Sequence, residues 1–216
     1  MSLLNNLIRR FLEHCEIDKN QSLKTIDNYS RYLRRFLKFA GDIEVSEIDL
    51  PLVQQYRLNL NRETNDKGSS LGKKTQNYHV IALRAFLKYL IKNDFKTLAP
   101  EKVELSKIPE RTVEFLTKEE VAALFEAVSK MPISQKEPTE QDKIKEKNRI
   151  LRDTAILEML YSTGLRVSEL AGLNRNQVDL NRREFMVRGK GKKPRIVFLS
   201  EHSAGKITEY LKNRND

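Results

Sequence analysis

The stretch YSTGLRVSEL, residues 161–170, places one arginine between a glycine and the first turn of a new helix. Glycine commonly ends a helix because it adopts the left-handed conformation without strain. Arg166 then falls at a helix N-terminus, where free N–H groups and the helix dipole favour an anion. A guanidinium placed there can hold phosphate oxygens through paired hydrogen bonds. The stretch therefore predicts two closely linked helices with either a phosphate-binding arginine or an ordinary surface charge between them.

Glu169 follows Arg166 by three residues, on the same face of the new helix. We expect its carboxylate to hold the arginine in one rotamer. The other interpretation is a plain surface ion pair, which stabilises a protein by well under ~1 kcal/mol. The rest of the chain has to decide between the two.

The segment from residue 116 to residue 216 is expected to combine helices with one hairpin. Thr117 and Glu120 form a capping box that opens the helix TKEEVAALFEAV. Residues 132–148 are almost wholly polar and are expected to form a solvated loop. The helix RDTAILEMLYSTG, residues 152–164, is apolar nearly all round, which predicts burial on most sides.

The run EFMVRGKGKKPRIVFLS, residues 184–200, predicts a β-hairpin whose turn is Gly-Lys-Gly. Basic residues gather on and before it: Arg182, Arg183, Arg188, Lys190, Lys192, Lys193 and Arg195. A two-stranded ribbon with a basic tip is one way to reach base edges or phosphates in a groove. A solvated turn is the alternative, although it explains one or two lysines better than this cluster.

Apolar residues recur at helical spacing in four stretches of the first hundred residues. The stripes are Leu4, Leu7, Ile8, Phe11, Leu12 and Cys15; Ile26, Tyr29, Leu33, Phe36, Leu37 and Ala40; Val53, Tyr56 and Leu60; and Tyr78, Ile81, Ala82, Ala85, Phe86 and Tyr89. Four helices with one apolar face each predict a small bundle over residues 1–97. Residues 98–115, with two prolines and no convincing period, predict a domain linker.

Two of these helices begin with lysine, which opposes the helix dipole and therefore invites a reason. A phosphate bound at each start would supply one. The predicted DNA contacts are Lys24, Thr25, Asn28, Arg31, Lys73, Lys74, Thr75, Gln76 and Asn77 in the bundle, and Arg188, Lys192, Lys193 and Arg195 on the hairpin. The alternative is that these residues are only the polar faces of amphipathic helices.

The composition supports a polyanionic partner. The net charge is +10, and both halves of the chain are basic. Distributed positive charge favours a long polyanion such as nucleic acid, although many proteins are mildly basic. Cys15 is the only cysteine, which fits a reducing compartment, and the three histidines are too scattered to predict a metal site. We expect a cytoplasmic protein with neither metal nor cofactor and no membrane association.

The residues RDTAILEMLYSTGLRVSELAGLNRNQVDL, followed by VRGKGKKPRIVFLS, resemble the tyrosine recombinase (phage integrase) family, especially its Xer-type members. The resemblance extends more weakly to SLKTIDNYSRYLRRFLKF and KKTQNYHVIALRAFLKYLIKNDF in the bundle, and to EFLTKEEVAALFEAV. It implies a SAM-like core-binding domain and a catalytic domain that together clamp a DNA duplex. The first catalytic arginine of the family falls on Arg166, its hairpin lysine falls on Lys190, and Glu169 takes a supporting role.

The family chemistry needs neither metal nor external energy. A tyrosine hydroxyl attacks the scissile phosphate and forms a phosphotyrosyl bond, which stores the energy needed for religation. Two arginines stabilise the charge of the transition state, and the hairpin lysine protonates the departing 5′ oxygen.

The sequence departs from the family pattern after the hairpin. The pattern places His-x-x-Arg, a further His or Trp, and the nucleophilic tyrosine beyond the next helix, and none of them is present there. Tyr210 lies too early to be that tyrosine. We therefore expect an N-terminal fragment that exposes apolar surface and binds DNA without cleaving it.

The expected fold class is mainly α: a four-helix SAM-like core-binding bundle, residues 1–97, a linker, residues 98–115, and a partial α+β catalytic domain with one β-hairpin, residues 116–216. The resemblance implies a DNA strand-transferase as the parent enzyme, with double-stranded DNA as partner. We expect a monomer off DNA, whereas the family forms tetramers on paired sites. The rival interpretations are a stand-alone non-catalytic DNA-binding relative and a helical protein-interaction domain.

Overall fold

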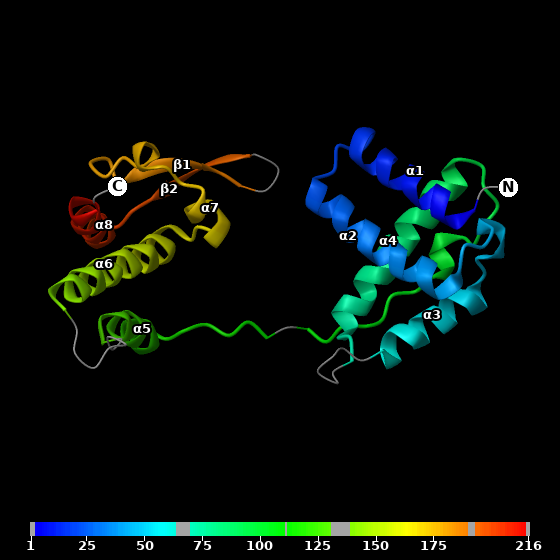
Figure 1. Ribbon diagram of the computed structural model, residues 1–216, viewed down its shortest axis with the longest axis horizontal. Coiled ribbons are helices and arrows are strands. Elements are labelled where there is room, and N and C mark those ends of the chain that lie inside the picture. Colours follow the sequence, from blue (N-terminus) through cyan, green and yellow to red (C-terminus); the bar gives the residue numbers. More distant parts are fainter. Residues whose placement is uncertain (1–2, 64–69, 111, 131–138, 190–192, 215–216) are drawn as a thin grey trace. The chain divides into compact units, whose positions relative to one another are not determined.

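The computed structural model describes residues 3–63, 70–110, 112–130, 139–189 and 193–214 (Figure 1). These residues form two compact units, one ending at Thr112 and the other beginning at Val113. The described part of the chain contains no helix that is long and apolar enough to span a membrane. Each unit has its own hydrophobic core.

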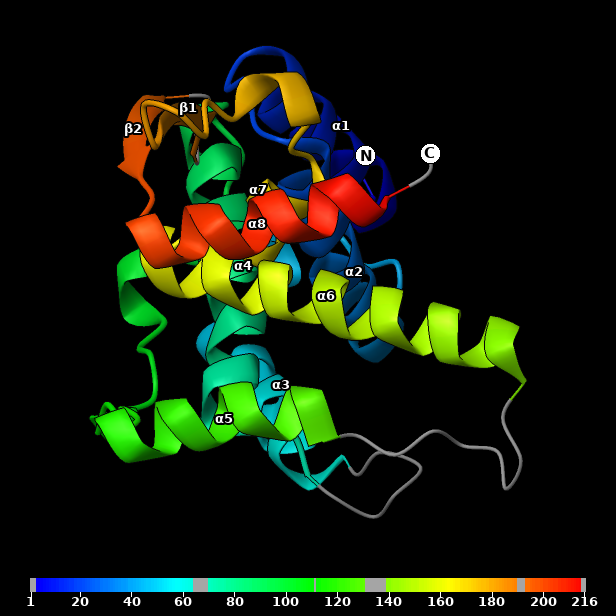
Figure 2. The same cartoon turned by 90° about the vertical axis from the view of Figure 1, so that its left-hand side faces the viewer.

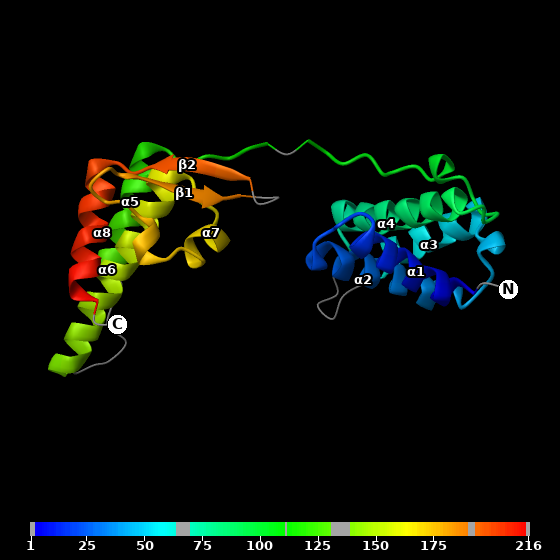
Figure 3. The ribbon, with the colours of Figure 1, turned by 90° about the horizontal axis from the view of Figure 1, so that it is seen from above.

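The first unit is a bundle of the four predicted helices (Figure 3). They are α1 (Leu4–Ile17), α2 (Leu23–Ala40), α3 (Leu50–Arg62) and α4 (Lys73–Lys92), with 3-10 turns at Val45–Glu47 and Pro100–Lys102. Local signals set the helix ends. Asp49 accepts a hydrogen bond from the Leu52 N–H at 2.8 Å, and Gly41 ends α2 at φ 78°.

Helix α4 is the centre of this bundle, because α1, α2 and α3 all contact it. Its side chains Leu83, Phe86, Leu87 and Leu90 are fully buried. Phe11 of α1 packs edge-on against Phe86, with ring centroids 5.6 Å apart. Burial of this many large side chains makes the bundle a well-packed scaffold.

The first part of the expected linker packs against this bundle. Val103 is buried in the core, and the amide of Asn77 exchanges two hydrogen bonds with the backbone of Ser106, at 2.8 and 2.9 Å. Arg57 also donates to the Ser106 hydroxyl at 3.2 Å. The chain therefore stays attached to the first unit at least as far as Ser106.

The second unit contains α5 (Lys118–Lys130), α6 (Glu140–Thr163), α7 (Val167–Ala171), a 3-10 turn (Arg175–Gln177), β1 (Glu184–Arg188), β2 (Pro194–Phe198) and α8 (Glu201–Asn213). Helices α6 and α8 lie side by side, and α5 packs on α6 (Figure 2). The predicted capping box of α5 is confirmed: the Glu120 carboxylate accepts the Thr117 N–H at 2.8 Å, and the Thr117 hydroxyl accepts the Glu120 N–H at 3.2 Å.

The predicted hairpin is present as the antiparallel pair of β1 and β2. Phe185, Val187 and Val197 point into a small core with Ala155 and Met159 of α6. Met186 and Ile196 face each other on the exposed side. This alternation is the period of a sheet with one buried face.

Two expectations for α6 were wrong. Residues 140–148 are helical rather than a loop, because Thr139 and Asp142 form a capping box and ion pairs such as Lys143–Glu140 line the exposed turns. Residues 131–138 lie outside the described residues. The later part of α6 is also less buried than expected: Ile156 is 40% and Tyr161 66% exposed.

Candidate functional site

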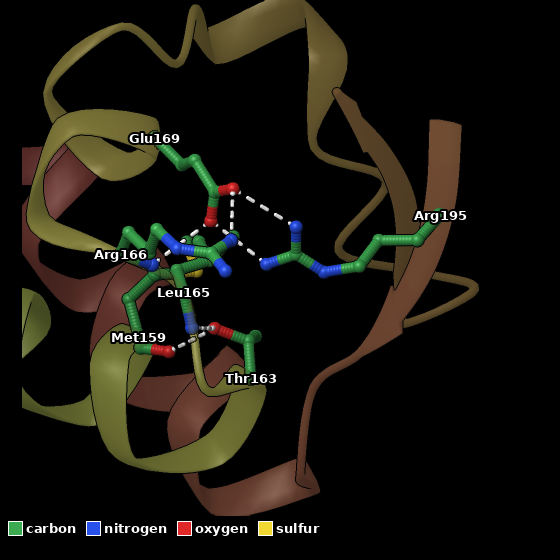
Figure 4. Close-up of polar contacts among 6 residues, drawn as sticks. All are labelled: Met159, Thr163, Leu165, Arg166, Glu169 and Arg195. Carbon is green, nitrogen blue, oxygen red and sulfur yellow. Dashed lines mark hydrogen bonds and ion pairs between the residues drawn. The ribbon is translucent and has the colours of Figure 1, made fainter. Parts of the chain in front are cut away.

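The junction between α6 and α7 places Arg166 as the sequence predicted. Gly164 ends α6 in the left-handed conformation at φ 62°, and its N–H donates to the Leu160 carbonyl at 2.9 Å. The Thr163 hydroxyl donates to the Met159 carbonyl at 2.5 Å and accepts from the Leu165 N–H at 3.3 Å (Figure 4). Leu165 is buried beneath this turn, so Arg166 emerges at the N-cap of α7 in a fixed backbone setting.

Glu169 holds two arginines from different elements (Figure 4). Its Oε2 accepts the Arg166 backbone N–H at 2.9 Å, and its Oε1 accepts Arg166 Nη1 at 3.0 Å. Arg195 of β2 approaches from the other side and donates Nη1 to Oε1 at 2.9 Å and Nη2 to Oε2 at 2.7 Å. The carboxylate is only 10% exposed, whereas the Arg166 side chain is 64% exposed. Glu169 therefore orients Arg166 without hiding it.

The electrostatics keep this cluster charged. Hydrogen bonds from Arg195, from the Arg166 backbone and from the Arg166 side chain lower the pKa of Glu169 to about 2. The same contact with Glu169 raises the pKa of Arg195. One carboxylate and two guanidinium groups leave a net positive charge at the site.

An open hollow of about 610 Å³ lies beside Arg166, lined by Gly164, Arg166, Gly189, Lys193, Pro194 and Arg195. Three of these residues are basic, so the hollow suits an anion with several oxygens, such as a phosphate. No three His, Cys, Asp or Glu side chains lie together as metal ligands in the described part of the chain. The basic lining of the hollow can stabilise negative charge through its guanidinium groups.

The other hairpin residues divide by face. Arg188 is exposed on the outer face of β1, opposite Pro194, and Lys193 is exposed next to the turn. Arg195 faces inward toward α7, although it was expected to contact DNA. Lys190 and Lys192 lie outside the described residues.

In the bundle, Lys24, Lys73 and Lys74 are exposed at their helix starts. Lys73 donates to Asn61 Oδ1 at 2.7 Å. The N-cap residue of α4, Gly72, offers no side-chain acceptor, so the first amides of α4 have no side-chain cap.

Thr25, Asn28 and Arg31 lie in the first turns of α2. The Thr25 hydroxyl lies 2.9 Å from that of Ser22, and Arg31 donates to Asn28 Oδ1 at 2.8 Å. Arg31 is exposed, and its guanidinium also lies over the ring of Tyr32. Together with Lys24 these residues form one polar surface around the start of α2.

Two expected DNA contacts of α4, Gln76 and Asn77, are buried and already have partners within the bundle. Gln76 is buried and donates to the Leu71 carbonyl at 2.6 Å, and Asn77 is buried in its two bonds to Ser106. Buried amides that already have partners would lose those hydrogen bonds on turning to a phosphate. Gln76 and Asn77 therefore stabilise the bundle, while Thr75 remains partly exposed in the same turn.

Two features of the site were not predicted from the sequence. Thr163 braces the turn before Arg166, and Arg195 pairs with Glu169 rather than facing solvent. A signal for the second exists in the sequence: Arg195 lies two residues before buried Val197, and residues two apart in a strand share a face. Tyr210 lines a separate apolar groove with Ile156, Met159 and Leu170.

Comparison with known proteins identifies the family. The model of the phage integrase family matches residues 114–216, and that of the phage integrase N-terminal SAM-like domain matches residues 8–94. The chain therefore belongs to the phage integrase family of tyrosine recombinases, as the sequence indicated.

Its relatives include Xer-type recombinases. The chain is 35% identical over 220 residues to tyrosine recombinase XerC of Pelobacter propionicus, covering 99% of this chain and 66% of the relative. It is 32% identical over 212 residues to tyrosine recombinase XerC of Bacillus subtilis, covering 98% and 64%. The chain thus spans slightly less than two thirds of the length of these relatives.

Solved structures share the fold. The Tn1549 transposon integrase in complex with a circular intermediate DNA matches with a TM-score of 0.70 and 18% identity, over 97% of this chain and 66% of that one. A lambda integrase tetramer bound to a Holliday junction matches with a TM-score of 0.67 and 15% identity, over 98% and 56%. These similarities support the mainly helical, two-unit fold with its hairpin.

Proposed function

We propose that this chain is the DNA-binding portion of a site-specific tyrosine recombinase, in which Arg166 grips the scissile phosphate. The observation that carries the proposal is the Arg166 guanidinium, exposed at a helix N-terminus, oriented by Glu169 and open to a basic hollow. A plain surface pair would not need a nearly buried carboxylate with a second arginine on it.

The chemistry assigned to Arg166 is charge stabilisation. Its guanidinium is placed to donate to the non-bridging oxygens of a phosphate, where negative charge grows during attack by a nucleophile. The resemblance assigns the protonation of the leaving oxygen to Lys190. The first unit would hold the duplex backbone through the polar surface at the start of α2 and through Lys73 and Lys74.

The proposal also covers what this polypeptide does alone. Residues 1–216 contain no His-x-x-Arg motif, and Tyr210 lines an apolar groove rather than the hollow beside Arg166. We therefore expect the 216-residue chain to bind DNA as a monomer in free solution and not to cut it. The DNA-bound state of the Tn1549 and lambda integrases supports a DNA partner.

The test is binding of the chain to a 30-base-pair duplex, followed by fluorescence anisotropy over a salt series. Contact with four or more phosphates predicts a log–log slope of about −3.6 or steeper. Arg166→Ala should weaken binding about tenfold, since a hydrogen bond to a charged group contributes about 1.5 kcal/mol. Arg182→Ala is the matched control, because the Arg182 side chain is exposed and its Nε lies 3.8 Å from the Asp179 carboxylate.

Weak binding that is insensitive to salt would contradict the proposal. Equal losses from Arg166→Ala and Arg182→Ala would remove the special role of Arg166 while leaving general DNA binding. A covalent protein–DNA adduct that survives boiling in detergent would contradict the non-cleaving assignment.

A further inference from the structure

We propose that Arg195 is a positioning residue: it acts through Glu169 to orient Arg166 and ties the hairpin to α7, and it does not itself contact DNA. The effect of Arg195 on DNA binding rests on the proposed function, because it acts through Arg166. The link between Arg195 and Glu169 is itself independent of that function, since both partners lie in the protein.

Arg195 fixes the orientation of the Glu169 carboxylate. Arg195 donates both terminal nitrogens to the two oxygens of Glu169, and this bidentate arrangement fixes the carboxylate plane. Arg166 then uses both oxygens of the same carboxylate, one with its backbone N–H and one with Nη1. The orientation of Arg166 thus depends on a carboxylate that Arg195 holds.

The hairpin backbone leaves room for the Arg195 guanidinium beside Gly189. A Cβ atom at Gly189 would lie 3.0 Å from Arg195 Nη1 and 3.8 Å from Glu169 Oε1. The absence of a side chain there lets the guanidinium lie against the hairpin just before its turn. Gly189 also donates its N–H to the Lys193 carbonyl at 2.9 Å, so Arg195 packs where the hairpin closes. The ion pair therefore joins the hairpin to α7 across 26 residues of sequence.

Arg195 is less exposed to solvent than Arg166. The Arg195 side chain is 36% exposed, and both of its terminal nitrogens are bonded to Glu169. Arg195 directs one N–H of each terminal nitrogen at Glu169, and turning the guanidinium away toward a phosphate would leave a nearly buried carboxylate with only Arg166 as partner, which is unfavourable. Arg166 has no such conflict, because most of its side chain faces solvent.

The test compares Arg195→Lys with Arg166→Ala in the full 216-residue chain. Lysine keeps the charge but cannot donate in bidentate fashion. A positioning role predicts that Arg195→Lys weakens binding to the 30-base-pair duplex about fivefold and that adding Arg195→Lys to Arg166→Ala costs nothing further. A direct DNA contact predicts instead that Arg195→Lys causes a small loss of affinity and that this loss multiplies with the loss from Arg166→Ala.

A second readout needs no DNA. In ¹⁵N NMR, the Arg166 guanidinium of the wild-type chain should show hindered rotation, which Arg195→Lys should release and the control Arg182→Lys should not. An unchanged Arg166 signal in Arg195→Lys would overturn the proposal. If the Arg166 signal responds while the wild-type chain shows no salt-dependent DNA binding, the proposed function fails and the positioning link stands.

Gly189→Ala serves if Arg195→Lys fails to fold. The added methyl group crowds Arg195 Nη1 but removes none of the three charged side chains, Arg166, Glu169 and Arg195. We expect the same release of Arg166 and a smaller loss of affinity, about twofold. Unchanged Arg166 signals in a folded Gly189→Ala chain would count against the link.

Discussion

The two units have similar lengths but differently packed interiors. The largest fully buried side chains among the described residues, including Tyr56, Phe36 and Phe86, all lie in the first unit. In the second unit the core is a small cluster around Met159 and Phe185, and every member keeps a few per cent of exposure. Beside it runs an open apolar groove of about 470 Å³ lined by residues of α6, α7 and α8.

This difference suits the first unit to act as a scaffold and the second unit to carry the candidate site. The first unit buries aromatic and aliphatic side chains deeply, so hydrophobic burial maintains its shape. The second unit holds its functional side chains through polar contacts on its surface, with Glu169 joining two elements. We infer that the second unit is the less stable of the two and that its site depends on a few specific hydrogen bonds.

Matched leucine truncations give the largest expected effect. Leu83→Ala removes a fully buried side chain of α4 and should destabilise the first unit by about 4–5 kcal/mol. Leu199→Ala, in the smaller core of the second unit, should cost about 2–3 kcal/mol because its surroundings can relax. Residue-resolved hydrogen exchange would assign each loss to its unit. Equal losses of unfolding free energy in the two variants would contradict the inferred difference in packing between the two units.

Low pH is expected to lower the stability of the first unit, which has the better-packed core. Burial, followed by the charges of Arg35 and Arg31, lowers the pKa of His79 from 6.5 to about 4. Below pH 6.5 this histidine is protonated in the unfolded chain, whereas His79 of the folded chain stays neutral until the pH approaches 4. The free energy of unfolding therefore falls as the pH drops below 6.5. Between pH 7 and pH 4 this linkage amounts to about 3 kcal/mol.

Urea unfolding of wild-type chain and His79→Gln at several pH values would measure this effect. The difference between the two chains should change by about 3 kcal/mol across the window, and His202→Gln, at an exposed histidine of the second unit, serves as control. A constant difference between wild type and His79→Gln would show that His79 does not titrate as inferred.

Helix caps give the smallest expected effect and should not distinguish the units. Ser22 caps α2 and Thr139 caps α6 through side-chain oxygens that accept backbone N–H groups at 3.3 and 3.2 Å. Ser22→Ala and Thr139→Ala should each cost about 1 kcal/mol. Circular dichroism during thermal unfolding would measure both. No loss in Thr139→Ala would mean that the first turns of α6 contribute little to the second unit.

The sequence predicted some elements of the structure and missed others. The helices of the bundle, the hairpin and the capping box at Thr117 carry strong short-range patterns, and all were predicted. The beginning of α6 was missed because residues 140–148 lack an apolar stripe, and its signals were a second capping box at Thr139 and a series of ion pairs. A solvated helix is stabilised by such local polar contacts, which apolar periodicity does not reveal.

The sequence by itself determined where Arg166 stands, because the glycine stop and the helix start on either side of it are local signals. Only the tertiary structure decided what surrounds that arginine. It brought Arg195 to Glu169 and buried Gln76 and Asn77 away from solvent. The physical reason is range: backbone preferences act over a few residues, whereas burial and ion pairing depend on which distant elements pack together.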